Sequence, residues 1–481
     1  MVAALAIIAV VVWQFFPKAP SKTSIAVLPF EDISPKKDQE YYCNGLAEDL
    51  ITRLNKIEAL KVPGRTSSFS FKGRGSSLRE IGEKLKVDNI LEGSLRKAGN
   101  KLRVTVRLIK AADGYPIWSD EYQRDAEDIF DLKDEICLAI INKLKLKLLR
   151  GEMEKLVKRH TENPEAYNLW LLGTHYYNKW THEGAKKARD YYEEATKEDP
   201  EYAAAYVGLA KSYYQLGSEM GLFSPREVFP QAKRAVERAL EIDKALSDAH
   251  TVLGTIKFYY DWDWEGAEVE FKRGIELNPN SAVAHDEYSI YLSAVGRVDE
   301  AIAEAKRSLE LDALLLIANS DLGWHYRVAQ QYDEALDHLN KTIELDPDFH
   351  MPHWNLGYVY LEMGMLQEAI AALEKAVALS GEHPGVKAGL GLVYAKADRK
   401  GEALKILEEL KQLSTGRYVS SLRIDHIYIG LGENDLALGW LEKAYEERDA
   451  TLIWLKVDRT YDSLRSDPRF KALLKKVGLE K

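Results

Sequence analysis

The spacing of hydrophobic residues changes along the chain, and in the first part it predicts an α/β domain. Residues 24–30 form a nearly continuous apolar run, which is typical of a strand buried on both faces. In residues 45–57 and again in residues 77–85, apolar positions recur at helical spacing. Two strands joined by a Gly-Asn turn are expected at residues 87–96 and 101–109. Weaker signals predict an extended piece at 60–62, a strand at 117–119 and a helix at about 125–149. These elements predict one mixed sheet with helices packed on it.

After residue 160 the pattern repeats, mostly with a period of 34 residues. The repeat is marked by alanines at Ala188, Ala232, Ala267, Ala301, Ala335, Ala369, Ala403 and Ala437. A period of this length indicates helix-turn-helix units stacked into a solenoid. Mostly small residues precede the later alanines by twelve positions, which suits close packing of two helices. The longer step from Ala188 to Ala232 predicts an insertion at residues 218–231, between the paired helices of the second repeat.

Composition divides the chain at the same place. A length of 481 residues with 46% hydrophobic content is enough for two or three domains that each bury a core. The 2 cysteines are too few for a disulfide scaffold or a clustered-thiol zinc site. Residues 18–150 carry 25 Lys and Arg against 20 Asp and Glu, whereas the rest of the chain carries 41 against 56. The boundary is therefore expected near residue 150, and the net charge of −10 argues against nucleic acid as a partner.

Several strings in these two regions resemble known families. The first region contains, in order, SIAVLPF (24–30), NGLAEDLI (44–51), LEGSLR (91–96), VRLI (106–109) and IWSDEY (117–122). This set resembles a TolB-like, FlgO-related domain, in the version that bacterial proteins carry between a membrane span and tetratricopeptide repeats. The strings DAHTVLG, NLGYVY and EAIAALEKA in turn resemble tetratricopeptide repeats, of which about eight would fill residues 164–450. In proteins of this kind the resemblance implies a winged-helix, kinase or adenylyl cyclase domain before the span, and this chain contains none.

A separate hydrophobic segment opens the chain. Residues 1–17 are uncharged and are followed by Lys18 and Lys22. A helix over residues 2–16 would span only about 22 Å, less than the roughly 30 Å hydrocarbon core of a bilayer. We expect a single-pass inner-membrane anchor, or the end of one that begins before Met1, with a cleaved signal and a buried helix as alternatives. The bulk of the chain is expected outside the cytoplasm, although the two lysines alone favour the opposite orientation.

The sequence contains no recognisable catalytic or metal-binding motif. It has no phosphate-binding GxxxxGK[ST] loop, no GxSxG, no HExxH and no EF-hand spacing. His350 and His353 could share a helical face, but Pro352 lies between them and no third ligand is near. Cys43 and Cys137 are expected to be buried on helices, with a disulfide between them as the alternative. We therefore expect no enzyme activity, no cofactor and no metal.

The solenoid offers the candidate binding surface. In tetratricopeptide arrays the first helix of each repeat lines a concave groove, and here that helix places towards it Trp170, Tyr177, Tyr214, Phe258, Trp324, Arg327, Trp354 and Tyr358. Aromatic residues and arginine dominate binding hot spots, with packing between repeats as the alternative role for each. Because the region is acidic, we expect protein or peptide partners that carry Lys or Arg beside apolar anchors.

Taken together, the sequence predicts a membrane-anchored, non-enzymatic interaction protein. Its parts are the anchor at residues 1–17, the α/β domain at 22–150, the repeats at 164–450 and a C-terminal cap at 451–481. The alternative is the sensory or regulatory part of a signalling protein, whose adenylyl cyclase, kinase or winged-helix output domain would precede Met1.

Overall fold

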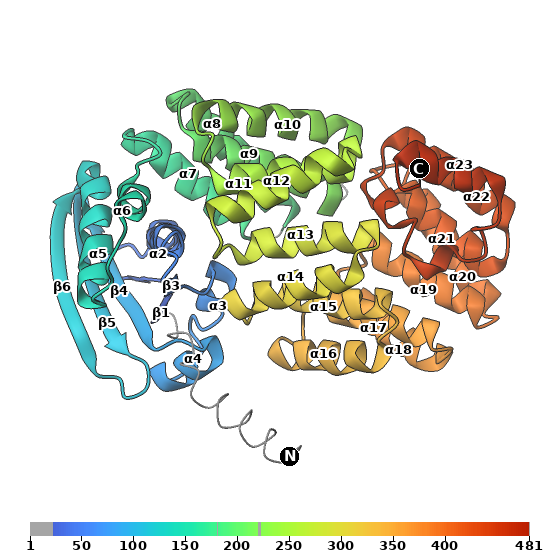
Figure 1. Cartoon of the computed structure of the whole chain (residues 1–481), viewed down its shortest axis with the longest axis horizontal. Coiled ribbons are helices and arrows are strands. Elements are labelled where there is room, and N and C mark those ends of the chain that lie inside the picture. Colours follow the sequence, from blue (N-terminus) through green and yellow to red (C-terminus); the bar gives the residue numbers. More distant parts are fainter. Residues whose placement is uncertain (1–22, 180, 220–222, 481) are drawn as a thin grey trace, which may run out of the picture.

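A computed structural model describes residues 23–179, 181–219 and 223–480 of the chain. The predicted anchor at residues 1–17 lies outside these residues. No helix in the described part is both long and apolar enough to cross a membrane. In Figure 1 the α/β domain lies at one end of the molecule, and the repeat helices extend from it towards the other end, where the chain terminates.

The first domain is built on one mixed sheet, which confirms the fold class predicted for it. Its strands are β1 (Thr23–Val27), β2 (Glu31–Asp32), β3 (Leu60–Lys61), β4 (Asn89–Ala98), β5 (Lys101–Lys110) and β6 (Pro116–Asp125). The strand order is β3-β1-β4-β5-β6, and β2 pairs with β4 beside this path. β1 runs parallel to β3 and β4, whereas β4, β5 and β6 follow one another as antiparallel hairpins.

Helices cover one face of this sheet along its length, and the other face is covered only in part. There α4 (Leu78–Leu85) buries Ala26 of β1 and Ile90 of β4, whereas β5 and β6 leave this face to solvent. α2 (Glu40–Asn55) and α5 (Ile129–Lys143) share a core with the buried positions of β5, among them Val104 and Val106. The alternate positions of β5 carry charges, such as Arg103, which pairs across the strands with Glu121 at 3.5 Å. The shorter helices of this domain are α3 (Arg65–Phe69), α4 (Leu78–Leu85) and the 3₁₀ turn η1 (Ala126–Asp128).

The helix predicted at about residues 125–149 is divided in the structure. α5 ends at Lys143, and α6 (Arg150–Val157) follows after a break. Lys145 has a φ of 54°, a left-handed conformation that a right-handed helix cannot continue through. The alternative of a disulfide between Cys43 and Cys137 is wrong, because both thiols are buried and free.

The second region is a solenoid of helix pairs, as the 34-residue period predicts. In chain order the pairs are α7 (Pro164–Tyr177) with α8 (His182–Glu198), α9 (Ala203–Tyr214) with α10 (Pro225–Ile242), α11 (Ser247–Ile256) with α12 (Trp264–Leu277), α13 (Ala282–Val295) with α14 (Val298–Leu311), α15 (Leu316–Val328) with α16 (Tyr332–Leu345), α17 (His350–Glu362) with α18 (Leu366–Leu379), α19 (Pro384–Lys396) with α20 (Lys400–Leu413), and α21 (Ser421–Leu431) with α22 (Asn434–Glu447). Two first helices end in a π-helical turn, η2 (Gln215–Glu219) after α9 and η3 (Lys257–Asp261) after α11.

Small residues allow the two helices of a pair to approach closely. A Cβ atom on Gly323 would lie 2.3 Å from Leu339, and one on Gly357 would lie 2.4 Å from Leu373. Both distances are well below van der Waals contact, so a larger side chain would push the helices apart. The backbone separation within these two pairs is therefore set by glycine opposite leucine, and in the third pair Gly254 faces Phe271 in the same way.

The insertion predicted at residues 218–231, between the paired helices of the second repeat, is partly helical in the described residues. Much of this segment lengthens α10, which has 18 residues and begins at Pro225. Ser224 and Glu227 form a capping box at its start, and such a box satisfies the free N–H groups of a first turn. Helix capping thus makes the later part of this segment, from Pro225, the start of a helix.

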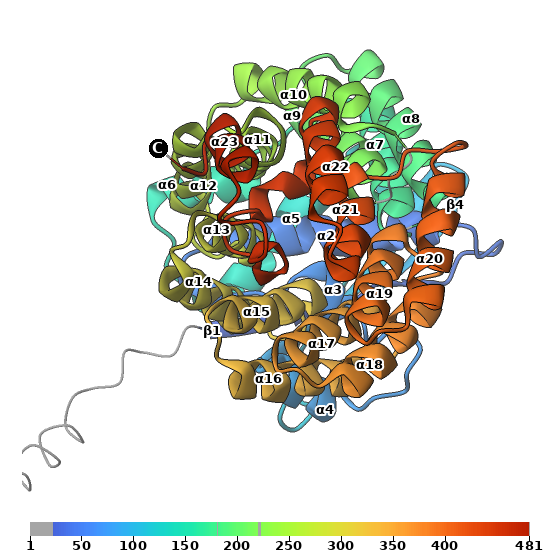
Figure 2. The same cartoon turned by 90° about the vertical axis from the view of Figure 1, so that its right-hand side faces the viewer.

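The C-terminal elements close the solenoid on itself. They are the 3₁₀ turns η4 (Ala450–Trp454) and η5 (Arg459–Tyr461) and the helix α23 (Pro468–Val477). α23 packs on α22 and also reaches the third pair, where the Trp264 Nε1–H donates to the Val477 carbonyl oxygen at 2.8 Å. Trp262 stacks on Tyr445 with 5.3 Å between ring centroids. Seen along the long axis in Figure 2, the repeat helices form a ring, with α21 to α23 towards the viewer.

The α/β domain covers the far end of this ring, where α2 and α3 appear behind its middle (Figure 2). α2 packs directly against α7, and a Cβ atom on Gly45 would lie 2.2 Å from Leu171. Beyond β3, the Gly64 N–H donates to the Asp312 carboxylate at 3.0 Å. The two domains therefore share apolar contacts and hydrogen bonds from backbone to side chain.

Asn280 makes the most extensive polar contact between the domains. Its Nδ2 group donates to the carbonyl oxygens of Asn55, Ile57 and Leu60 at 3.2, 2.9 and 3.2 Å. The last carbonyls of a helix have no partner within the helix, so a donor from another domain satisfies them. Asn280 is 2% exposed, and water does not replace it as a donor there.

We predict that Asn280→Ala lowers the free energy of unfolding by about 1–3 kcal/mol, because buried carbonyl groups lose their donor. Asn280→Asp keeps the size of the side chain but removes the N–H donors, and we expect it to be at least as destabilising. Urea denaturation followed by circular dichroism measures both. Asn142→Ala, at an exposed position of α5, is the control. Equal losses at positions 280 and 142 would contradict the docking role of Asn280.

Candidate functional site

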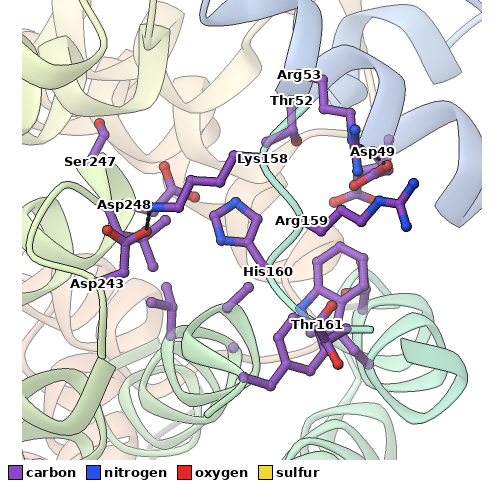
Figure 3. A pocket seen from close by; sticks show the side chains of 18 of the residues that line it. Asp49, Thr52, Arg53, Lys158, Arg159, His160, Thr161, Asp243, Ser247 and Asp248 are labelled. Atoms are coloured by element: carbon purple, nitrogen blue, oxygen red, sulfur yellow. Dashed lines mark hydrogen bonds and ion pairs between the residues drawn. The ribbon is translucent and has the colours of Figure 1, made fainter. Parts of the chain in front are cut away.

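A cavity of about 250 Å³ lies where the α/β domain meets the first repeats. Its walls come from α2, from residues 158–161 of the connecting segment and from the first helices of the solenoid. In Figure 3 the ring of His160 lies in the middle of the cavity, with Lys158 and Asp243 on one side and Arg159 on the other. Because both domains contribute walls, this interdomain cavity depends on their docking.

Most charges around the interdomain cavity are paired. Asp49 lies 3.0 Å from Arg53 and 3.1 Å from Lys133. Burial alone would raise the pKa of Asp49, but these two cations lower it to about 2. The Lys133 ammonium also lies 3.8 Å from the ring centroid of Tyr167. Burial lowers the pKa of Lys133, which is 2% exposed, and the contact with Asp49 opposes this shift.

His160 has a different electrostatic role. Its Nε2 atom lies 3.4 Å from the Nζ atom of Lys56. Burial lowers the pKa of His160 to about 3 and also lowers the pKa of Lys56. His160 is therefore a neutral ring at physiological pH, and it accepts a hydrogen bond from Lys56. Lys158 next to it pairs with Asp243 at 2.7 Å.

Two of the predicted groove residues, Trp170 and Tyr177, line the interdomain cavity. Two others pack within the solenoid, one fully buried and one half-buried. Phe258 is fully buried in the core between the third pair and the C-terminal elements. Tyr214 packs against Phe229, with 5.9 Å between ring centroids. Phe258 stands in the π-helical turn η3, whose different residue spacing turns side chains away from the face that an α-helical count predicts.

A second cavity, of about 210 Å³, lies inside the ring of repeats. Trp324 on α15 and Trp354 and Tyr358 on α17 line it, so the structure brings together three of the residues predicted as the densest part of the groove. The C-terminal residues Trp454 and Tyr461 line it as well. Trp324 and Trp454 meet edge to face, with ring centroids 5.1 Å apart. What was predicted as an open groove is here an inner cavity closed in part by the chain's own C-terminal segment.

Arg327 does not face a partner, in contrast to the prediction. It is 1% exposed and lies 2.6 Å from Glu362 and 3.6 Å from Asp458. Its guanidinium carbon lies 3.9 Å from the ring centroid of Trp324 and 5.1 Å from that of Tyr358. Asp458 comes from the C-terminal segment. When this segment closes the ring, it pairs with the guanidinium group of Arg327, which the sequence analysis had assigned to partner binding.

The sequence analysis missed a group of buried carboxylates on the inner helices. Burial raises the pKa of Glu287 and of Asp321 to about 7 in each case. Burial and the neighbouring Asp321 also raise the pKa of Asp286 well above its usual value. Within the described residues, Asp286 Oδ1 and Asp321 Oδ2 have no hydrogen-bond partner. One feature of the sequence could have indicated this group. Asp286 and Asp321 stand on the first helices of two successive repeats, and no Lys or Arg lies one helical turn from either.

In the described part of the chain, no group of three or more His, Cys, Asp or Glu residues is placed to hold a metal ion. His350 and His353 both lie on α17. Both residues are half-buried, and this burial lowers the pKa of each imidazole.

Comparisons with known families divide the chain as its fold does. Residues 21–139 match the model of the HilA/YgeH-like transcriptional regulator, second domain. Residues 177–219, 325–364 and 360–423 match models of tetratricopeptide repeats, which confirms the predicted repeat family. None of these matches supports the resemblance to a TolB-like domain, and the first region is instead similar to HilA-like regulators.

Similar proteins cover parts of this chain. The putative adenylate cyclase 3 of Rhizobium meliloti (strain 1021) is 37% identical over 194 residues, which are 40% of this chain and 33% of that protein. The chain thus spans a third of the length of this curated relative. Among solved structures, PilF of Pseudomonas aeruginosa is 18% identical, with a TM-score of 0.35, and the match covers 49% of this chain and 96% of that one. Human IFIT1 in a dimer with PPP-AAAA is 15% identical, with a TM-score of 0.46, and the match covers 72% and 78%.

The buried carboxylates predict a stability that depends on pH. A carboxyl group whose pKa is raised by folding stabilises the protein fully below its unfolded pKa and loses this contribution as pH rises through about 7. The free energy of unfolding should therefore fall between about pH 4 and pH 7. Asp321→Asn and Glu287→Gln should each reduce this fall, whereas the exposed control Asp337→Asn should not. Urea titrations across this pH range measure it, and an unchanged slope in both variants would refute the assignment.

We predict that Arg327→Leu lowers the free energy of unfolding by about 3–5 kcal/mol, because it leaves two buried carboxylates without their cation. The matched control is Arg399→Leu, which breaks an exposed pair with Glu402 and should cost less than about 1 kcal/mol. Thermal and urea unfolding of the two variants compare these costs. Equal losses of unfolding free energy in the two variants would show that the buried ion pairs of Arg327 do not stabilise the fold more than an exposed pair does.

Proposed function

We propose that this chain is a non-enzymatic regulatory module of a signalling protein, in which the tetratricopeptide repeats bind protein partners and the α/β domain controls that binding. The observation that carries the proposal is the docking of the α/β domain on one end of the ring of repeats. Asn280 and Asp312 of the solenoid hold backbone groups of the other domain, and the interdomain cavity lies beside this contact. A change in one domain is thereby coupled to the surface that the other domain offers.

The comparisons support this reading over a free-standing scaffold. The repeat models match over much of the solenoid, and tetratricopeptide repeats are protein-binding modules. The model that matches the first domain describes transcriptional regulators, and the curated relative is named as an adenylate cyclase. We take both descriptions as support for a role in signalling and not in metabolism. Membrane anchoring through residues 1–17 stays a prediction from the sequence.

The way the ring is closed constrains where partners bind. The inner face near Trp324 and Trp354 is covered by the C-terminal segment, in which Leu452 and Leu455 are fully buried. Burial of such side chains contributes roughly 1.5–3 kcal/mol each, so a partner does not displace this segment easily. We therefore place the partner surface on the outer parts of the solenoid and at its contact with the α/β domain.

The proposal predicts partner capture that depends on docking. The wild-type chain, the double variant Asn280→Ala/Asp312→Asn and the control Asp337→Asn are each immobilised and exposed to an extract of the organism that encodes them. A specific protein should be retained by the wild type and the control, and its retained amount should change in the double variant, because docking then fails. Purified chain should form no cyclic AMP from ATP.

Three results would count against the proposal. Capture that is identical in all three baits would contradict control by the α/β domain. No specific protein on any bait would contradict a partner-binding module. Cyclic AMP formation that a single substitution abolishes would contradict the non-enzymatic assignment.

A further inference from the structure

The second cavity has a largely aromatic wall. Of the side chains that line it, Trp324, Trp354, Tyr358, Trp454 and Tyr461 present rings, and Ile290, Met351 and Leu422 add apolar surface. Aromatic rings attract organic cations through their electron-rich faces as well as burying apolar groups. The wall therefore suits a small organic molecule with a positive group.

A carboxylate without a counter-ion faces this cavity. Asp321 lines it, and its Oδ2 atom is buried and accepts no hydrogen bond from the described residues. The ionisable groups that interact electrostatically with Asp321 are two other carboxyl groups, those of Glu287 and Asp286. Buried polar atoms in folded proteins are nearly always partnered, so an orphaned acceptor in a cavity wall indicates a missing donor. An ammonium group would supply both the donor and the opposite charge.

A cation without a carboxylate partner lines the same cavity from another helix. Arg423 on α21 has its guanidinium carbon 5.7 Å from the ring centroid of Trp354. Among the described residues, none forms an ion pair with it. A guanidinium group presents a planar set of N–H donors that matches a carboxylate in two parallel hydrogen bonds. The wall thus offers a second, separate site for an anionic group.

The remaining charges at the cavity are already neutralised. Asp458 pairs with Arg327 at 3.6 Å, and Arg327 pairs with Glu362 at 2.6 Å. Burial lowers the pKa of His426 to about 4, so this imidazole, which lies 3.0 Å from the Tyr461 hydroxyl, is neutral at physiological pH. Asp321 and Arg423 are the acidic and the basic side chain of the wall that remain without an ion pair among the described residues, and they lie on different helices.

We propose that the second cavity binds a small zwitterion, a free amino acid, with its ammonium group at Asp321, its carboxylate at Arg423 and its side chain among the aromatic rings. An amine without a carboxylate would leave Arg423 unpaired, and an organic acid without an amine would leave Asp321 unpaired. A charge that is buried without a partner is costly, so the complete zwitterion fits better than either half. The volume of about 210 Å³ is below the roughly 300–1,000 Å³ of drug-sized sites and limits the ligand to this size.

This site goes beyond the proposed regulatory function and does not require it. Ligand binding would add contacts between α15, α17, α21 and the C-terminal segment, all of which line the cavity. Such a ligand stabilises the closed ring, because it binds the folded state and not the unfolded one. Amino-acid binding can thus be measured on the chain alone, without a partner or an output domain.

The test begins with the twenty standard amino acids as separate probes, each at about 1 mM, in thermal unfolding of the full chain. At least one should raise the melting temperature and quench tryptophan fluorescence, since Trp324 and Trp454 line the site. Isothermal titration calorimetry then compares that amino acid with its decarboxylated amine and its deaminated acid. Each half-molecule should bind at least about tenfold more weakly than the amino acid.

Matched variants locate the site. Asp321→Asn and Arg423→Gln should each weaken binding at least about tenfold. Asp321→Asn keeps the shape of the side chain and removes a buried like-charge contact, so this variant is expected to fold. Asp337→Asn and Arg399→Gln change the same residue types at positions outside the cavity and should bind as the wild type does.

Each of the other outcomes would overturn the proposal. If no amino acid changes the melting temperature, the cavity holds only water. If the decarboxylated amine binds as tightly as the amino acid, the site is one for simple cations. If both Asp321→Asn and Arg423→Gln bind as tightly as the wild type, the amino acid binds elsewhere on the chain.

Discussion

Glycine and alanine packed against large residues of the paired helix set the geometry on which the rest of the structure depends. Gly323 meets Leu339 and Gly357 meets Leu373 at distances that allow no additional carbon atom. Repetition of this contact with a constant period gives each pair a similar rotation relative to the one before it, so the array curves steadily. The curvature is strong enough for the C-terminal helix to reach the third pair, where Trp264 binds the Val477 carbonyl. Closure of the ring follows from helix packing within the repeats.

Once the ring is closed, its two ends acquire different roles. The far end receives the α/β domain, whose backbone is held by solenoid side chains such as Asn280. The interior receives the C-terminal segment, which carries Asp458 to Arg327. In both contacts, buried polar groups find their hydrogen-bond or ion-pair partner on the other segment. Because such interactions depend on distance and direction, they specify how two segments fit together more strictly than apolar contacts do. These two contacts therefore fix the α/β domain and the C-terminal segment on the ring of repeats.

Charge inside the ring is distributed unevenly. Near the α/β domain, Asp49, Arg53 and Lys133 neutralise one another. Further along the inner helices, burial and the closeness of Asp286, Glu287 and Asp321 to one another raise the pKa values of these carboxyl groups. Unpaired buried charges reduce stability, and proteins keep them where a ligand or a function compensates. The paired charges near Asp49 therefore mark a structural interface, whereas the carboxyl groups near Asp321 mark a candidate binding site.

The sequence alone determined the architecture, because its two signals are local. The apolar run at residues 24–30 and the regular alanines after residue 160 depend on neighbours along the chain, and they predicted a mixed sheet and a helical solenoid. The sequence also placed Trp324, Trp354 and Tyr358 on one inner face, where the second cavity now has them. Only the tertiary structure decided which inner residues are accessible. Arg327 is paired with Asp458, more than a hundred positions later, and Phe258 is turned into the core by a π-helical turn. Helical periodicity assigns a residue to a face, but what covers that face depends on contacts between segments distant in sequence, and no local pattern encodes them.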